Sequence, residues 1–484
     1  MRRTVAALGI AAMLAGCGGG DGGGTLTSGA GGGATGGITT PAPTPVQTAG
    51  CSLRERQDWA AAQLREWYLF PETLPASLDP APYASVDAYV DALTATARGQ
   101  RKDRYFTYLT SIKEEDAYYG SGSSAGFGFR LGVDGSTGRL YVTEAFEGAP
   151  ALNAGIDRGA EIVAIGTTAA NLQSAASLYA AGGSALSDAL GPDTAGTSRY
   201  LQVRTAGSTR TVAVAKTDFT LLPVSTRYGA QIISDAGRQF GYLNLRTFIS
   251  TADPALRDAF ARFKAAGITN VVVDLRYNGG GLVSTSQLMG DLLGANRSTS
   301  EVFNFTTFRP EKAAENDTRF FQPQAQSIAP TRIAFIGTGG TASASELLIN
   351  AFIPYLHANA GLIGTNTYGK PVGQIALDKP ACDDRLRVIA FATQNAARQG
   401  AYYDGLAATV EASCRADDDI SYPLGDPREA STRAALDFLE GKSCQRITAT
   451  ASADVRAQSL PAGRALLAPG DGGSTAQREV PGLF

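Results

Sequence analysis

The sequence predicts a multidomain protein of mixed α/β (α+β) class, with a helical N-terminal segment, a β-rich domain and a larger α/β core. Apolar residues recur at helical spacing in residues 51–117. Short apolar runs between glycine turns, with one helix, fill residues 118–222, and strand and helix patterns alternate over residues 223–446. Residues 447–484 lack periodicity, so we expect a disordered tail. A chain of 484 residues has room for these domains.

Residues 1–16 predict an export signal. Arg2 and Arg3 precede an apolar run at residues 5–14, which is shorter than the roughly 20 residues that span a bilayer. The tetrapeptide Leu-Ala-Gly-Cys that ends at Cys17 resembles the lipobox of bacterial lipoproteins. This resemblance implies a lipid anchor on the Cys17 thiol and a place in the cell envelope, on the periplasmic side of the outer membrane in a Gram-negative host. An ordinary secretory signal with a chance cysteine is the alternative.

Residues 17–50 predict a flexible tether. Between residues 18 and 50, 13 of the 33 residues are glycine, and proline follows at alternate positions from Pro41. Such a segment buries too little apolar surface to fold, and as a random coil it reaches roughly 30 Å.

The other four cysteines predict two disulfides, because an even number of cysteines in an exported chain favours pairing. We expect one bond between Cys382 and Cys414, which closes a local loop. The second would join Cys51 to Cys444 and tie the ends of the folded part together. The sequence leaves the other pairings open.

Composition excludes several classes of function. The charge balance of 42 basic and 45 acidic residues, without a basic block, argues against a nucleic-acid partner. The single histidine, His357, rules out a multi-histidine metal site, and we expect neither a metal nor a cofactor. Residues 53–69 and 86–97 predict two helices of a small cap, to which we assign no chemistry.

The β-rich domain contains a glycine-phenylalanine repeat and a second motif downstream. The repeat consists of Gly126, Phe127, Gly128 and Phe129. With the run at residues 148–166, it resembles a PDZ domain, departing from that family at Ala160, and a closing hairpin is predicted at residues 201–219. The resemblance implies that backbone N–H groups of the repeat hold a C-terminal carboxylate. The neighbouring strand edge would accept the peptide, and the two phenylalanines would line its pocket.

The α/β core is predicted from alternating strands and helices. We expect strands at residues 240–245, 271–276, 332–336, 361–364 and 388–393, and helices at residues 254–266, 286–293, 346–357 and 427–440. The glycine turn at residues 277–281 does not have P-loop or dinucleotide-binding spacing. It can instead present a backbone N–H to a developing negative charge. Ser343 and Ser345 precede a helix, where serine is commonly only a cap.

Three separated motifs resemble the C-terminal processing (tail-specific) serine peptidases: residues 274–281, residues 341–346, and Tyr368-Gly369-Lys370 with Gln374. The order of the domains, with the PDZ-like domain first, matches that family as well. The resemblance implies a ClpP/crotonase-like core. It implies Ser343 as nucleophile, Lys370 as general base and Gln374 as the residue that orients the lysine. The backbone N–H of Ala344, with one from Gly279 or Gly280, would form the oxyanion hole.

Two departures from the family pattern leave an alternative open. The spacing from Glu346 to Lys370 is about two residues longer than usual, so Ser345 remains an alternative nucleophile. Pro354 stands near where some relatives have an acidic residue, so no aspartate joins the pair. His357 lies about three helical turns from Ser343, which is too far for it to act as base. A lysine base needs its pKa lowered from about 10.4 toward about 7 or 8, which burial can achieve.

The predicted function is a serine endopeptidase that cleaves exported proteins near apolar C-termini. A catalytically inactive peptide-binding lipoprotein with the same fold is the alternative. The chain itself ends in an apolar segment, residues 480–484, which a PDZ-like groove could accept, so self-processing is conceivable. The sequence does not indicate an oligomeric state.

Overall fold

The α/β core is built on a six-stranded sheet in the order β10-β11-β12-β15-β16-β19. The computed structural model describes residues 48–182, 184–448, 458–459, 464–468 and 473–484. The strands of the core sheet are β10 (Ala230–Asp235), β11 (Arg238–Asn244), β12 (Asn270–Asp274), β15 (Arg332–Gly337), β16 (Ala360–Gly364) and β19 (Ala412–Arg415). From β11 to β19 all neighbours are parallel, while β10 pairs with β11 antiparallel. The carboxyl ends of the parallel strands therefore lie along one edge of the sheet.

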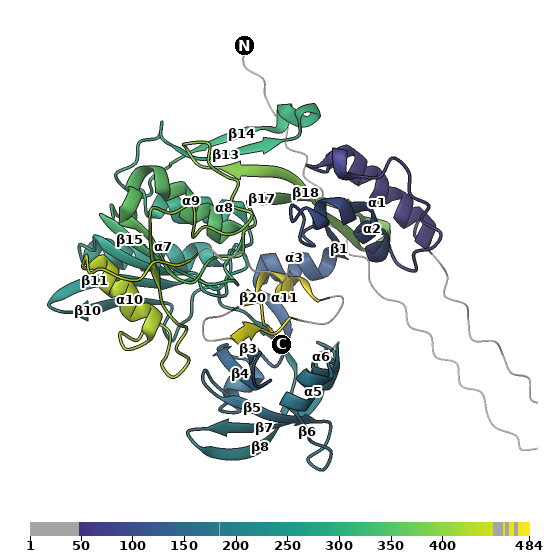
Figure 1. Ribbon diagram of the computed structural model, residues 1–484, viewed down its shortest axis with the longest axis horizontal. Helices are drawn as coiled ribbons and strands as arrows, with labels where there is room; N and C mark the ends of the chain where they lie inside the picture. The colour runs from purple at the N-terminus through teal and green to yellow at the C-terminus, as the bar shows by residue number, and fades with distance from the viewer. Residues whose placement is uncertain (1–47, 183, 449–457, 460–463, 469–472) are drawn as a thin grey trace, which may run out of the picture. The chain divides into compact units, whose positions relative to one another are not determined.

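Helices cover both faces of this sheet (Figure 1). They are α7 (Ala252–Ala265), α8 (Val283–Leu292) and α9 (Ala344–Leu356) on one face, and α10 (Ala430–Leu439) on the other. Successive side chains of β12 point to opposite faces of the sheet. Val271 and Val273 pack in the cluster with α7, α8 and α9, and Val272 packs with α10. The predicted strands and helices are thus present, with bounds that differ by a few residues, but the strand expected in the core at residues 388–393 is part of β18 (Asp384–Gln394), in a separate antiparallel sheet.

A second, antiparallel sheet connects the core to the N-terminal helices. Its strands are β1 (Tyr108–Ser111), β13 (Val302–Phe308), β14 (Asp317–Phe320), β17 (Val372–Lys379) and β18 (Asp384–Gln394). Helices α1 (Leu53–Trp67) and α2 (Val86–Gly99) pack on it through a cluster that includes Leu64, Val90 and Ile389. Because β1 pairs with β18, the N-terminal segment is part of the same sheet as β17, which follows Lys370.

The β-rich domain, residues 123–220, follows helix α3 (Ile112–Ser121). Its strands are β2 (Ser123–Gly126), β3 (Phe129–Asp134), β4 (Leu140–Ala145), β5 (Glu161–Gly166), β6 (Gln173–Ser174), β7 (Ser198–Thr205), β8 (Ser208–Ala215) and β9 (Thr217–Thr220). Its helices are α4 (Pro150–Asn153), α5 (Ala175–Ala181) and α6 (Ala185–Leu190), so it contains three short helices where one was expected. The predicted closing hairpin is β7–β8, with the turn at Ala206 and Gly207.

Both predicted disulfide pairings are wrong. Cys51 bonds to Cys382, and Cys414 bonds to Cys444. Cys382 lies between β17 and β18 of the antiparallel sheet, whereas Cys414 lies in β19 at the edge of the core sheet. Cys382 and Cys414 are therefore close in sequence but belong to two different sheets.

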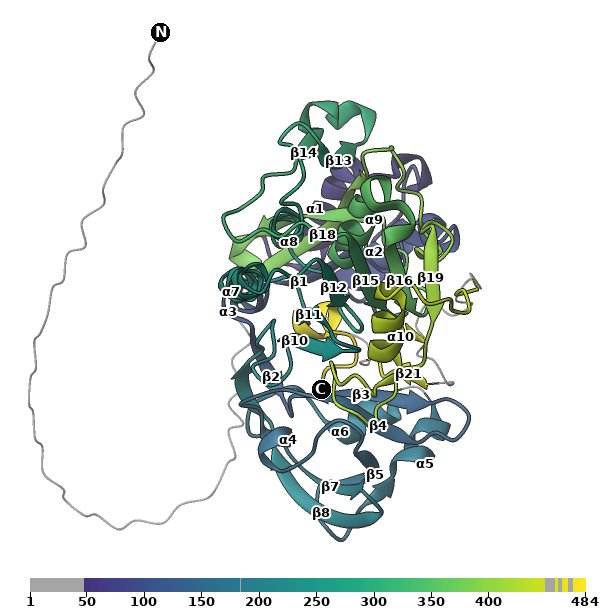
Figure 2. The same cartoon turned by 90° about the vertical axis from the view of Figure 1, so that its left-hand side faces the viewer.

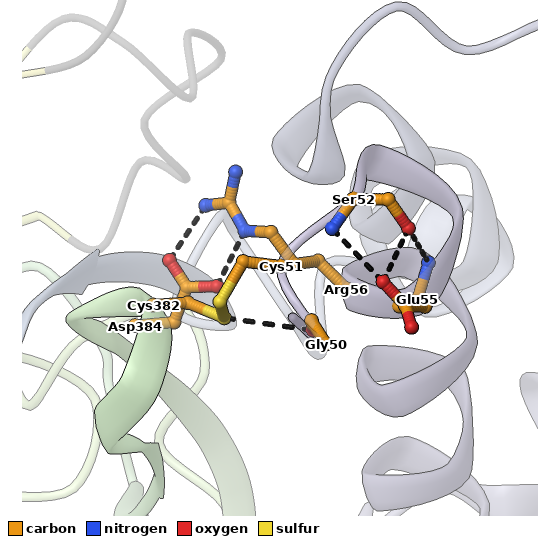
Figure 3. Close-up of a disulfide and its surroundings, with 7 residues drawn as sticks. All are labelled: Gly50, Cys51, Ser52, Glu55, Arg56, Cys382 and Asp384. Atoms are coloured by element: carbon orange, nitrogen blue, oxygen red, sulfur yellow. Dashed lines mark hydrogen bonds and ion pairs between the residues drawn. A yellow bond between two sulfur atoms is a disulfide. The ribbon is translucent and has the colours of Figure 1, made fainter. Parts of the chain in front are cut away.

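The observed disulfides join segments that already lie side by side. Cys51 immediately precedes α1, and Arg56 on that helix forms two hydrogen bonds of 2.6 Å with Asp384, next to Cys382 (Figure 3). The segment after α10 returns along β19, where the N–H of Arg415 donates to the carbonyl of Gln445 at 2.7 Å. Each disulfide thus reinforces a contact that hydrogen bonds also make.

The prediction of a disordered tail is also wrong for much of residues 447–484. Strand β20 (Gln458–Ser459) pairs with β21 (Arg464–Leu466), which pairs with β3, and helix α11 (Thr475–Glu479) precedes the C-terminus. The last residue lies beside β3 in both views of the chain (Figures 1 and 2). Tertiary packing orders this segment, in which Val480 and Phe484 are buried.

The export signal, Cys17 and nearly all of the tether, through residue 47, fall outside the described residues. Among the helices that are described, none combines the length and the apolar character needed to cross a bilayer.

Candidate active site

Ser343 lies in a tight turn between strand and helix. The turn leaves the carboxyl end of β15 at Gly337, and α9 begins at Ala344. Ser343 has φ 56° and ψ −115°, a backbone conformation that costs a residue with a side chain about 1–3 kcal/mol. Its side chain is partly exposed. The turn therefore presents the Ser343 hydroxyl at the helix N-terminus, where backbone N–H groups have no partner within the helix.

Ser345 has a different environment. It is fully buried, and its hydroxyl donates to the carbonyl of Asn278 at 3.1 Å. This hydrogen bond joins the serine turn to the glycine turn at the end of β12. The contrast favours Ser343 as the serine whose hydroxyl a ligand can reach.

The glycine turn, residues 277–281, lies directly beside the serine turn. Its Gly280 N–H donates to the side-chain oxygen of Asn278 at 2.9 Å, so this N–H is already engaged. The N–H of Gly279 instead donates to the carbonyl of Glu479, in the C-terminal segment, at 3.1 Å. A Cβ on Gly280 would lie 2.7 Å from the Cβ of Ser343, so only glycine permits this approach. Of the two glycines predicted for an oxyanion hole, Gly279 is the one whose N–H points away from its own turn, to a carbonyl of the C-terminal segment.

Lys370 lies in the turn between β16 and β17. Its ammonium donates to Gln374 Oε1 at 2.7 Å and lies 4.8 Å from the centre of the Phe106 ring. Gln374 in turn donates from Nε2 to the carbonyl of Phe106, which fixes which end of the amide faces the lysine. Burial lowers the pKa of Lys370, although the carboxylate of Glu479 acts in the opposite direction.

Glu346 joins the serine turn to the lysine turn. Its Oε2 accepts hydrogen bonds from the N–H groups of Ser343 at 3.1 Å and Lys370 at 2.7 Å, and its Oε1 accepts from Gly369 at 2.7 Å. Burial raises the pKa of this carboxyl, while the backbone N–H groups act to lower it. The sequence motifs predicted no role for Glu346. The available signal was its charge: it lies three residues after the serine and is the one charged residue in helix α9.

Arg104, another residue with no predicted role, supports the lysine turn from the N-terminal segment. Its guanidinium donates to the carbonyls of Tyr368 at 2.6 Å and Gly369 at 2.5 Å, and it lies 4.0 Å from the centre of the Tyr368 ring. The side chain is almost completely buried. The N-terminal segment, expected to be a cap without chemistry, therefore supplies contacts on both sides of Lys370.

A small cavity of about 150 Å³ lies where these turns meet. The N-terminal segment, the core and the C-terminal segment all line it, with Arg104, Tyr105, Phe106, Tyr108, Gly279, Ala342, Tyr368, Lys370, Arg478, Glu479 and Pro481. The site thus brings Lys370 and the glycine turn to one space. His357 lies outside it: this residue caps the far end of α9, is 66% exposed and pairs with Glu411.

The glycine-phenylalanine repeat of the β-rich domain also holds a ligand. The N–H groups of Gly128 and Phe129 point to the terminal oxygen of Phe484, at 2.9 and 3.4 Å, and the Phe484 N–H donates to the carbonyl of Phe129 at 3.0 Å. Leu131 continues this pairing by donating to the carbonyl of Gly482 at 2.8 Å. The end of the chain is therefore an added strand on β3. The side chain of Phe484 packs in the same apolar cluster as Phe127 and Phe129.

Buried ion pairs join the β-rich domain to the core. Arg130 on β3 donates to the carbonyl of Tyr277 in the glycine turn at 3.0 Å and pairs with Glu144 at 3.3 Å. Arg246 of the core donates to the same glutamate at 2.6 Å. Burial acts to raise the pKa of Glu144, but the two arginines lower it to about 2. Removing one partner of such a buried pair typically destabilises a protein by about 3–5 kcal/mol, so this contact is specific.

Comparison with known proteins agrees with this architecture. Residues 239–399 match the model of peptidase family S41. The chain is 29% identical over 268 residues to the C-terminal processing peptidase, chloroplastic, of Tetradesmus obliquus, an alignment that covers 53% of this chain and 54% of that protein. It is 24% identical over 279 residues to the carboxy-terminal processing protease CtpA of Bacillus subtilis, covering 57% and 53%. The chain spans about half the length of the curated relatives it matches.

A solved structure extends the likeness in fold. The S41 protease from Bacteroides fragilis superposes with a TM-score of 0.61 at 23% identity, covering 79% of this chain and 97% of that one. The resemblance to the C-terminal processing serine peptidases, predicted from three short motifs, is confirmed by these matches.

Proposed function

Because residues 239–399 match the model of peptidase family S41, we propose that this chain is a serine endopeptidase with a Ser343–Lys370 pair at its centre. The observation that carries the proposal is the Glu346 carboxylate, which binds the backbone of both residues and so holds their turns together. Ser343 is the accessible serine of its turn, and Lys370 is a partly buried amine with a lowered pKa. A neutral amine near a serine hydroxyl can act as its general base.

The proposed reaction follows from these positions. Lys370 takes the proton of the Ser343 hydroxyl as its oxygen attacks a peptide carbonyl, and the lysine then protonates the leaving amine. Water hydrolyses the resulting acyl-enzyme, with the lysine again moving the proton. Gln374 orients the lysine, and the N–H groups of Gly279 and Ala344 stabilise the negative charge that develops on the carbonyl oxygen. Lowering a lysine pKa from about 10.4 to about 7 or 8 requires roughly 3–5 kcal/mol of differential interaction, and burial acts in this direction on Lys370.

We propose that the β-rich domain recognises the substrate as a PDZ-like domain does. Its glycine-phenylalanine repeat would bind the C-terminal carboxylate, and β3 would accept the substrate backbone as an added strand. The contacts of Gly128 and Phe129 with the chain's own terminus support this role. Proteins with apolar C-termini are the expected substrates, because the pocket around Phe127 and Phe129 is apolar.

The proposed location is the cell envelope, with a lipid anchor on Cys17. Two disulfides are compatible with an oxidising compartment. Metabolic labelling with a radioactive fatty acid tests the anchor: the wild type should be labelled and Cys17→Ala should not. Equal labelling of both would contradict this location.

The test of the proposed activity compares two serines in one turn. An unfolded reporter protein with an apolar C-terminus is incubated with the wild type, Ser343→Ala and Ser345→Ala, and its cleavage is followed by mass spectrometry. We expect Ser343→Ala to lose at least about 10³-fold in turnover, because the nucleophile is gone. Ser345→Ala loses only a buried hydrogen bond, so its turnover should stay within about tenfold of the wild type. Equal loss in both variants, or no cleavage by the wild type, would contradict the proposal.

A further inference from the structure

The C-terminal segment, residues 474–484, follows the path that a substrate of the proposed peptidase would take. Its last residue is held by the glycine-phenylalanine repeat, through the N–H groups of Gly128 and Phe129. Five residues earlier, the carbonyl of Glu479 accepts the N–H of Gly279 at 3.1 Å. One short segment thus occupies both the carboxylate-binding turn and an oxyanion donor.

The segment is packed into the protein along its whole length. Val480, Leu483 and Phe484 are each at most 3% exposed. Arg130 donates to the carbonyl of Pro481 at 2.5 Å, and Gln477 Nε2 donates to the carbonyl of Leu483 at 3.1 Å. These contacts satisfy backbone groups that a loosely attached tail would leave to water.

The beginning of the segment is anchored as well. Thr475 donates its N–H to Glu114 on α3 at 2.8 Å, and Tyr119 on the same helix donates to the Glu479 carboxylate at 3.1 Å. The carboxylate is buried near Lys370, where its negative charge favours the protonated lysine. A general base must be unprotonated, so this contact opposes the reaction.

The conformation of the segment suits an inhibitor better than a substrate. On the N-terminal side of the Glu479 carbonyl, residues 475–479 form helix α11. Recognition by strand addition needs an extended chain, and the segment is paired with β3 only at residues 482–484. The carbonyl therefore reaches the donor while the chain before it is not extended.

We propose that residues 474–484 are an intramolecular ligand that blocks the peptide groove and the active site, so that substrates with apolar C-termini must displace the enzyme's own terminus. This inference rests on the proposed function for its effect on catalysis, but the binding of the segment can be tested without any turnover. A tethered ligand acts at a local concentration in the millimolar range, which makes even a weak segment an effective competitor.

The binding test uses a fluorescent peptide with the sequence of residues 474–484. We expect it to bind Phe484→Asp, in which a charged side chain cannot occupy the apolar pocket, at least about tenfold more tightly than it binds the wild type. Phe320→Asp is the matched control, since Phe320 is exposed on β14 and this variant should bind like the wild type. The same peptide with an amidated C-terminus should bind Phe484→Asp at least about tenfold more weakly, because it lacks the carboxylate. Equal binding of the peptide to the wild type and Phe484→Asp would overturn the proposal.

Hydrogen exchange of the wild type provides a measurement that needs no variant. The amide of Phe484 is paired with β3 and should exchange at least about tenfold more slowly than in the free peptide. Exchange at the free-peptide rate would overturn the proposal even if Phe484→Asp failed to fold.

The catalytic test separates this inference from the proposed function. Cleavage of the reporter protein by Phe484→Asp should exceed that by the wild type by about tenfold, while the intact mass of the wild type should retain residues 480–484. Cleavage at equal rates, or loss of these residues from the wild type, would overturn the inhibitory role and leave the proposed activity intact. Tighter peptide binding by Phe484→Asp, with no cleavage of the reporter by the wild type or any variant, would have a different meaning. It would support binding of the C-terminal segment in the groove and contradict the proposed peptidase activity.

Discussion

Two glycine-containing turns hold the same C-terminal segment with the same chemical group, a backbone N–H. In the β-rich domain, Gly128 and Phe129 point their N–H groups at a terminal carboxylate, which carries its charge before and after any reaction. In the core, Gly279 points its N–H at a peptide carbonyl, which becomes charged only in the transition state. The first turn can therefore contribute only to binding. In the proposed mechanism the second turn would stabilise the transition state more than the bound substrate, and so would contribute to rate.

The largest expected effect comes from a substitution that abolishes the reaction and does not alter the carboxylate-binding turn. In Lys370→Met the proposed base is lost, so kcat for the reporter protein should fall by about 10³-fold or more. Affinity of a shorter fluorescent peptide, residues 480–484, in the Phe484→Asp background should stay within about twofold, because this peptide keeps the contacts to the carboxylate turn but lacks Glu479, whose carboxylate interacts with Lys370. Lys264→Met, on the outer helix α7, is the control and should match the wild type. Turnover that survives in Lys370→Met would mean that another group is the base.

A matched pair of glycine substitutions tests the comparison directly. A Cβ on Gly279 would meet the Glu479 carbonyl oxygen at 2.7 Å, and a Cβ on Gly126 would meet the terminal carbon of Phe484 at 2.9 Å. Within 3.0 Å, each added methyl group meets only the C-terminal segment, so the fold should tolerate both changes. In the Phe484→Asp background, Gly279→Ala keeps the N–H, but its methyl group would hold a substrate carbonyl away from it. We therefore expect kcat to fall by about 10²-fold, the size of a lost oxyanion donor.

The partner substitution should act on the other kinetic constant. In the same background, Gly126→Ala should raise KM by about tenfold with kcat nearly unchanged, because it disturbs only the binding of the terminal carboxylate. Steady-state kinetics on the reporter protein separates the two constants. A fall in kcat of similar size in both variants would show that the two turns act as one unit. It would contradict the assignment of one turn to binding and the other to catalysis.

A substitution in the N-terminal segment should lower kcat less than a substitution of one of the reacting groups. Arg104 donates to the carbonyls of Tyr368 and Gly369 and lies over the Tyr368 ring, so we expect it to position the base and to take no part in the reaction itself. Arg104→Lys keeps the charge but loses the planar guanidinium, whose Nη2 donates to both carbonyls and which stacks on the Tyr368 ring. We expect kcat to fall by about tenfold with KM unchanged, and peptide binding to the groove to stay as in the parent. An increase in KM alone would place Arg104 in substrate binding instead.

The fold of the core and the family resemblance were predictable because their signals are local. The strand around Val272 alternates its side chains between two helical layers, and the motifs that resemble the family each lie within a few residues. The disulfides failed because closeness in sequence does not report which sheet a cysteine joins: Cys382 and Cys414 lie in different sheets.

The role of Glu346 also depended on distant residues. Two of its hydrogen bonds come from Gly369 and Lys370, 23 and 24 residues further along the chain. The C-terminal segment was expected to be disordered because it has no periodicity of its own. It is ordered by pairing with β3, where Leu131 and Gly482 meet.

The smallest expected effect concerns the charge state of Lys370 while the segment is bound. The Glu479 carboxylate raises the pKa of this lysine against the lowering effect of burial, so Glu479→Gln should move its titration to lower pH. Above that pH the amine is neutral and can act as a base; below it the amine is protonated and cannot. The chain has eight lysines, few enough for NMR of ¹³C-labelled lysine side chains to follow this group in a Ser343→Ala background. Glu66→Gln is the control, because Glu66 pairs with Lys312 at 2.7 Å and should leave the Lys370 titration unchanged. A titration that stays in place in Glu479→Gln would mean that the segment blocks the site by occupying it alone, without holding the base in its protonated form.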